Sequence, residues 1–113
     1  MNQDLINKVY IWGRDKGLHQ PDLRPQFIKL TEELGELAAA IARDDRSAVV
    51  DAVGDMLVVM IQLGGSVAEA WADDDDHNRL GQHFLEACLH QAWLEIRDRK
   101  GETVNGTFIK ASD

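Results

Sequence analysis

Apolar residues recur at three- and four-residue steps through most of this chain, which is the period of amphipathic helices. The pattern predicts helices over residues 2–16, 26–43 and 78–99, and another from the turn at 44–46 to about residue 63. Gly17 is placed to end the first helix, and Pro25 to occupy the first turn of the second. We expect Gly64-Gly65 to break or bend the chain before residues 66–71.

The second predicted helix carries one narrow apolar stripe, which we expect to be buried against the next helix. Helical geometry then places Glu33 about 60° and Glu36 about 120° from the middle of the stripe, at the rim of the packed seam. The stripe consists of Phe27, Leu30, Leu34, Leu37 and Ile41.

The helix predicted at 78–99 is apolar on two faces and must bury both, which a chain with three other helices barely allows. We therefore expect self-association. Residues 103–109 have an extended pattern with a turn at Asn105-Gly106. The predicted fold is all-α: a single domain over residues 1–113, built as a four-to-five-helix bundle with a short extended C-terminal tail, and oligomeric.

The net charge and the cysteine count exclude some classes of function. The chain has 113 residues and a formal net charge of −8, which argues against binding polymeric nucleic acid through a basic surface. Cys88 is its one cysteine, which excludes an intrachain disulfide and suits a reducing cytoplasm. We expect no signal peptide, and no membrane helix, because the apolar run ending at Leu63 contains Asp51 and Asp55.

Two groups of carboxylates carry the candidate chemistry. Glu32-Glu33 and Glu36 lie on the second predicted helix, and Asp51 and Asp55 lie one hairpin later, in a mostly apolar segment. Burying carboxylates there is unfavourable unless a cation compensates them. Oxygen ligands suit Mg²⁺, Mn²⁺ or Ca²⁺, so we predict a divalent metal site between the two helices.

These acids also support a resemblance. The run Glu32-Glu33-x-x-Glu36, a short hairpin and the step Gly54-Asp55 resemble the MazG-like nucleoside triphosphate pyrophosphohydrolases. Further similar segments are Gln26-Phe27-x-Lys29-Leu30, residues 93–101 and Asn105-Gly106, so that the resemblance covers about residues 9–110. It implies Mg²⁺-dependent cleavage of a nucleoside or deoxynucleoside triphosphate between the α and β phosphates. It also implies a homodimer or homotetramer, with the 100–105 segment near a partner's acid cluster.

The resemblance implies roles for individual residues. Glu33, Glu36 and Asp55 would hold Mg²⁺, for which Mn²⁺ could substitute. The family pattern has a glutamate where this chain has Ala52; Asp51 is the natural replacement, although it is rotated about 100° from that position. We expect Glu32, Glu33 and Asp51 to take part in catalysis, with Asp51 also a metal ligand. The expected substrate-binding residues are Trp12 and Asn105 for the base and Lys29, Arg97 and Lys100 for the phosphates.

Other functions remain open at this stage. The same superfamily contains dimeric dUTPases and phosphoribosyl-ATP pyrophosphohydrolases. The departure at Ala52 also allows a helical dimer that binds a metal or a nucleotide without hydrolysing it. The preferred base and sugar are not predicted.

Overall fold

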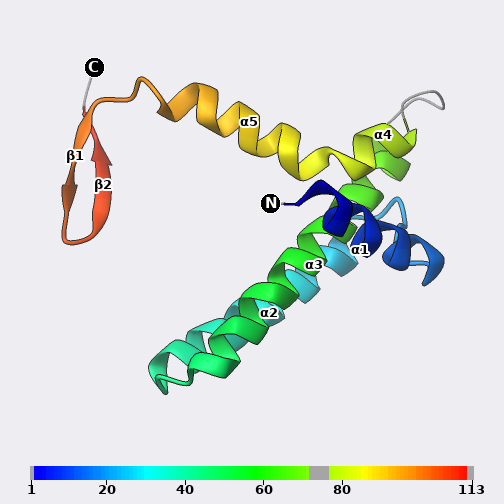
Figure 1. Cartoon of the computed structure of the whole chain (residues 1–113), viewed down its shortest axis with the longest axis horizontal. Coiled ribbons are helices and arrows are strands. Elements are labelled where there is room, and N and C mark those ends of the chain that lie inside the picture. The colour runs from blue at the N-terminus through cyan, green and yellow to red at the C-terminus, as the bar shows by residue number, and fades with distance from the viewer. Residues whose placement is uncertain (1, 72–76, 112–113) are drawn as a thin grey trace.

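The computed structural model describes residues 2–71 and 77–111, and these are mostly helical, as expected (Figure 1). A two-stranded antiparallel sheet follows the helices at the C-terminal end. The elements are α1 (Gln3–Asp15), α2 (Arg24–Ala42), α3 (Arg46–Trp71), α4 (His77–Gln82), α5 (Phe84–Ile96), β1 (Gly101–Val104) and β2 (Thr107–Lys110).

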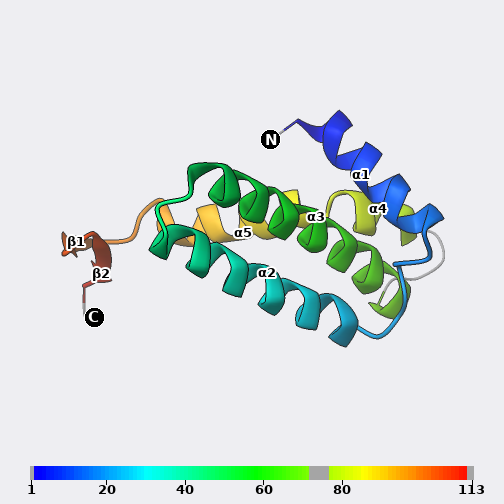
Figure 2. The same ribbon diagram turned by 90° about the horizontal axis from the view of Figure 1, so that it is seen from below.

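The helices α2 and α3 form an antiparallel hairpin, seen side by side in Figure 2. Local signals define its ends, as predicted. Pro25 lies in the first turn of α2, and Asp44 takes a positive φ of 53° in the connection. The Oδ1 atom of Asp45 accepts a hydrogen bond from the Ala48 N–H at 3.1 Å, which caps the first turn of α3.

The glycine pair in α3 does not end the helix, so the predicted break at Gly64-Gly65 is wrong. Both glycines are buried where other segments approach closely. A Cβ on Gly65 would collide with the His19 ring, and one on Gly64 would lie 2.9 Å from the carbonyl oxygen of Gly81. Glycine costs about 1 kcal/mol in a helix relative to alanine. This close packing explains why the helix tolerates two of them.

The long helix α3 is the centre of the fold, because α1, α2, α4 and α5 all pack against it. Its mean hydropathy reaches 1.6, so by length and composition it meets the criteria for a membrane-crossing helix, which we did not expect. The core helix of a soluble protein can have the same length and composition. Gln62, buried in the middle of α3, donates to the Val9 carbonyl oxygen at 3.1 Å and bonds His19 Nε2 at 2.8 Å.

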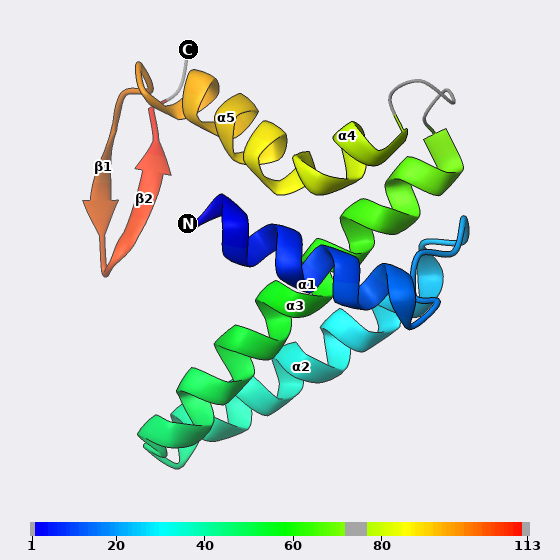
Figure 3. The same ribbon diagram turned by 45° about the vertical axis from the view of Figure 1, so that its right-hand side comes forward.

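The predicted helix at 78–99 is divided at His83, whose φ of −110° and ψ of 11° are not helical. The break separates α4, which packs on α3, from α5, which leads away from the helical core (Figure 3). No residue of α5 is buried. The prediction of one helix missed this division, because the close approach of Gly81 to Tyr10 and Gly64 directs α4 and is a tertiary contact.

The two strands form a hairpin with a two-residue turn. Val104 pairs with Thr107, and both Asn105 and Gly106 have positive φ, of 51° and 79°, as a type I′ turn requires. The predicted tail is therefore extended, as expected, but it is a paired sheet. Among residues 2–71 and 77–111 the hairpin contacts no other helix or strand, and Figures 1 and 2 show it standing apart at the end of α5.

Candidate metal centre

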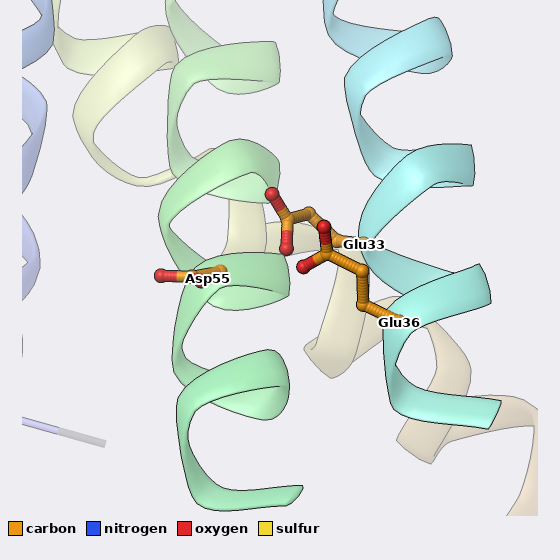
Figure 4. A group of neighbouring side chains, drawn as sticks. All are labelled: Glu33, Glu36 and Asp55. Carbon is orange, nitrogen blue, oxygen red and sulfur yellow. The ribbon is translucent and has the colours of Figure 1, made fainter. Parts of the chain in front are cut away.

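Three carboxylates meet between α2 and α3. Glu33 and Glu36 are one helical turn apart on α2, and Asp55 lies opposite them on α3 (Figure 4). One oxygen from each lies within 4.8 Å of the others. Three carboxylates gathered in this way supply the hard oxygen donors that Mg²⁺ or Mn²⁺ prefers. The predicted ligands Glu33, Glu36 and Asp55 are thus close together.

Glu33 is the buried member of the cluster, with 5% of its surface exposed. Its Oε1 atom lies 3.3 Å from the Lys29 ammonium, whereas its Oε2 atom is buried and has no hydrogen-bond partner. A buried carboxylate oxygen without a partner is unfavourable by about 1–3 kcal/mol or more. A cation bound between the three acids would satisfy it, so the residues present fit a divalent metal.

The orientation of α2 differs from the prediction. We expected the stripe containing Leu34 to be buried and Glu33 to lie at its rim. Instead Glu33 faces α3, and Leu34 is 53% exposed. Phe27 and Ile41, seven residues before and after Leu34, are also more than half exposed. The covered face of α2 instead holds Glu33 and Ala40, which are buried, together with Leu30 and Leu37, which are half-buried.

The charges of the cluster act on one another. The negative charge of Glu33 is the main cause that raises the pKa of Glu36, with some loss of hydration and the charge of Asp55 adding to the effect. Lys29 opposes this change. The pKa of Lys29 is itself raised, first by its hydrogen bond to Glu33 and then by the charges of Glu33 and Glu32. The site therefore favours bound protons or cations.

Asp51 and Asp55 are exposed, so the expectation that they would be buried in an apolar segment is wrong. Val50 and Val53, which flank these acids in the sequence, are exposed as well. Asp51 is not one of the three clustered acids. It lines a neighbouring pocket of about 370 Å³, together with Glu36, Asp55, Arg43, Ala39, Ala48 and Ala52.

Lys29 contacts the cluster through Glu33, and Glu32 contacts Lys29. The Lys29 ammonium lies 3.5 Å from Glu32 Oε2 as well as 3.3 Å from Glu33, and Glu32 is exposed.

Trp12 is half exposed on α1, which packs on α3 and α4. In the described parts of the chain, no contact joins α1 to α2. Trp12 is therefore not brought beside the carboxylates of α2.

The remaining predicted residues belong to the arm formed by α5 and the hairpin. Arg97 follows α5 and pairs with Asp98 at 3.3 Å, Lys100 precedes β1, and Asn105 lies in the hairpin turn. Within residues 77–111 and 2–71, the hairpin touches neither α2 nor α3. A single chain does not bring Arg97, Lys100 or Asn105 to the acid cluster.

Arg43 is a residue that the sequence analysis missed. It lines the pocket beside Glu36, Asp51 and Asp55. The signal was present in the sequence, because Arg43 is seven residues after Glu36 and seven residues are close to two helical turns. Lys29 is seven residues before Glu36 and therefore lies on the same side of α2. One basic residue thus precedes the acids along the helix, and another follows them.

No protein-family profile matches the chain, and no solved structure does. The chain is similar to a phage protein described as an uncharacterized 18.2 kDa protein in the rep-hol intergenic region of Haemophilus phage HP1 (strain HP1c1), with 39% identity over 62 residues. The match covers 54% of this chain and 38% of the phage protein. The chain thus spans well under half the length of the relative that it matches, and the MazG-like assignment stays a prediction.

Proposed function

We propose that this protein is a Mg²⁺-dependent nucleoside triphosphate pyrophosphohydrolase of the cytoplasm. Its reaction consumes one water, opens the linkage between the α and β phosphates of a ribo- or deoxyribonucleoside triphosphate, and releases the monophosphate and pyrophosphate. The structural observation that supports this function is the buried, unpartnered Oε2 atom of Glu33 within the cluster of Glu36 and Asp55. Neither a membrane nor polymeric nucleic acid is part of the proposed activity.

Glu33, Glu36 and Asp55 would hold the divalent ion, which Mn²⁺ can replace. When bound, such an ion neutralises phosphate charge and lowers the pKa of a coordinated water. Glu33 is suited to fix the position of the site, because burial and the ion pair with Lys29 restrict its side chain. Glu36 and Asp55 are exposed and leave the site open to a substrate.

Asp51 is the better candidate than Glu32 for accepting the proton of the attacking water. Glu32 is already paired with Lys29. Asp51 is exposed, has no ion-pair partner among the residues that the structure describes, and lines the pocket that also contains Glu36 and Asp55. A carboxylate within reach of a bound water is the geometry that general base catalysis needs.

The proposed enzyme works as a homodimer or homotetramer. The exposed surface of the chain is 8320 Å², whereas a compact monomer of 12.7 kDa exposes about 6,200 Å². Its radius of gyration is 16.5 Å, against about 13 Å for a compact chain of this length. The excess surface is of the size that stable dimer interfaces bury.

The apolar surfaces show where a second copy would pack. An exposed apolar row runs along α2 and consists of Phe27, Leu34 and Ile41. Leu34 lies about 160° round the helix axis from Glu36. The arm is also exposed, including Leu89 and Trp93 of α5. An isolated two-stranded hairpin is marginally stable, so the arm requires a partner surface. Exchange of arms would bring Arg97, Lys100 and Asn105 to a neighbouring copy.

The test of this function is a panel of ribo- and deoxyribonucleoside triphosphates, dUTP and phosphoribosyl-ATP, assayed with Mg²⁺ for pyrophosphate release. We expect turnover for at least one nucleoside triphosphate, and its loss in EDTA. Glu36→Gln and Asp55→Asn should each reduce turnover by at least about 100-fold, as removal of a charge-stabilising group at a reacting centre does. Asp15→Asn, at the exposed end of α1, is the matched control and should leave turnover unchanged.

A second candidate function is a helical dimer that binds a metal or a nucleotide without hydrolysing it. The observation that favours it is the position of Asp51 outside the three-carboxylate cluster, with the apolar Ala52 beside it. Binding of Mn²⁺ and nucleotide with no pyrophosphate released from any substrate of the panel would establish this alternative and overturn the enzyme.

A further inference from the structure

The pocket beside the acid cluster has a cationic side as well as an acidic one. It is lined by Glu36, Asp51 and Asp55, with Arg43 as its basic residue. We propose that Arg43 makes this pocket a subsite for the phosphate chain of a metal-bound ligand, and that inorganic pyrophosphate is the smallest ligand it takes. This inference rests on the proposed function, because it assumes a divalent ion at Glu33, Glu36 and Asp55.

The helix positions place Arg43 beyond the proposed ion, along the axis of α2. Arg43 is seven residues after Glu36, which corresponds to roughly 10 Å of helix. On α3, which runs in the opposite direction, Asp55 belongs to the cluster and Asp51 lies one turn closer to the connection at 43–45. A ligand held by the ion at one end of the pocket would therefore extend past Asp51 towards Arg43.

The pocket has room for such a ligand because alanines line the rest of it. Ala39, Ala48 and Ala52 contribute only methyl groups, and Ala52 is 3% exposed, at the contact between the helices. The volume of about 370 Å³ lies within the range of small-molecule sites, which is about 300–1,000 Å³. No long side chain among the lining residues fills the space between the carboxylates and Arg43.

The guanidinium is available to a ligand. Its closest ion pair, Nη2 to Asp45 Oδ2, is 3.8 Å long, and the side chain is 60% exposed. Arg24 is different, because Asp22 holds it through two hydrogen bonds of 2.9 Å. A guanidinium with unused N–H groups suits phosphate oxygens, since its planar donors can engage two of them at once.

The charges of the pocket make binding depend on the metal. Three carboxylates and one guanidinium give the lining a net negative charge, which repels a free polyphosphate. A divalent ion at the cluster reverses the local sign. The buried Oε2 atom of Glu33, which has no partner, marks the end of the site at which this ion would bind. Pyrophosphate should therefore bind only to the metal-loaded protein.

The experiment is isothermal titration of the full-length protein with inorganic pyrophosphate, in the presence and absence of Mn²⁺, beside a titration with Mn²⁺ alone. For the wild type we expect pyrophosphate binding only when Mn²⁺ is present. Arg43→Gln should weaken this binding by about 10-fold or more, the usual effect of losing hydrogen bonds to a charged group. Its affinity for Mn²⁺ alone should stay within about threefold of wild type.

Two further variants test the assignment. Arg43→Lys keeps the charge but loses the planar donors, and should recover part of the affinity even if Arg43→Gln folds poorly. Arg14→Gln removes another exposed arginine, whose ion pair with Asp15 is also loose at 3.6 Å, and should bind pyrophosphate as the wild type does. Wild-type pyrophosphate affinity in folded Arg43→Gln, or equal weakening in Arg14→Gln, would overturn the assignment.

The results also separate this inference from the proposed function. Absence of Mn²⁺ binding by the wild type would overturn the metal centre and the subsite together. Normal Mn²⁺ binding with unchanged pyrophosphate affinity in Arg43→Gln would overturn only the subsite. Metal-dependent pyrophosphate binding that requires Arg43, in a protein that hydrolyses no nucleotide, would support the subsite and overturn the hydrolase.

Discussion

Lys29 and Glu33, one helical turn apart on α2, form an ion pair of 3.3 Å that neutralises only one side of the Glu33 carboxylate. The other oxygen is buried without a partner beside Glu36 and Asp55. Lys29 thus allows the acid to be buried, yet leaves an oxygen that a second cation can satisfy. This half-compensated carboxylate accounts for most of the physical behaviour expected of the site.

Divalent metal should stabilise the folded protein. A ligand that binds only the folded state at a hundredfold excess over its dissociation constant adds about 2.7 kcal/mol, which is on the order of 10 °C in melting temperature for a chain of this size. Differential scanning calorimetry with Mg²⁺ or Mn²⁺ measures the shift. Asp55→Ala should abolish it, and a metal response that persists in this variant would remove Asp55 from the site.

The pH dependence of stability should reflect the raised pKa of Glu36. An acid whose pKa is raised on folding favours the folded state below its ordinary value of 4.5, and that contribution is lost as the pH rises through the folded-state pKa. Metal-free protein should therefore lose stability as the pH rises above 4.5, and stabilisation by metal should grow over the same range. Melting temperatures from pH 4 to 7, with and without EDTA, measure both trends.

Glu36→Gln is the control for the pH series, because it removes the titrating group while keeping its shape. The metal-free variant should have a flatter pH profile than the wild type. An unchanged profile would show that the crowding of Glu36 by Glu33 has no effect on stability.

Asp51 should matter for turnover more than for metal binding. Asp51→Ala is expected to reduce turnover about as much as Glu36→Ala does, while the metal-induced rise in melting temperature persists because Asp51 lies outside the cluster. Adding Glu at position 52 in the Asp51→Ala background should restore part of the activity, because Ala52 lines the same pocket. Wild-type turnover in Asp51→Ala would instead assign the proton acceptor to Glu32.

Self-association should depend on the arm. We expect light scattering at micromolar concentration to report a mass well above 12.7 kDa. Leu89, on α5, is 65% exposed in the single chain, so Leu89→Asp should not disturb its packing but should split the assembly and reduce turnover. Gln20→Asp, which adds the same charge in an exposed loop, is the control. A wild-type protein that is monomeric would contradict the proposed assembly.

Cys88 provides a second measure of assembly. It is the one cysteine of the chain and is exposed on α5. If a second copy covers this helix, the rate at which a thiol reagent labels Cys88 should rise on dilution into the monomeric range. Labelling that is fast and independent of concentration would place α5 outside the interface.

The sequence by itself determined the features that depend on neighbours a few residues away. The apolar period predicted helices, Pro25 marked the start of α2, and Asn105-Gly106 specified the tight turn of the hairpin. The carboxylate motif and its hairpin spacing also led to the three acids that meet. These signals are local because capping, turn geometry and helical period act within one or two turns of the chain.

Tertiary structure alone decided which face of each helix is covered. Leu34 belongs to the apolar row, yet it is exposed while Glu33 is buried, because the packing of α2 on α3 covers the face that carries Glu33 and Ala40. Gly64-Gly65 continues α3 because other segments pack against it, and the chain divides at His83 where α4 meets α3. The position of Asp51 outside the three-carboxylate cluster likewise depends on how α3 packs on α2. Burial and convergence depend on distant segments, which a local pattern does not specify.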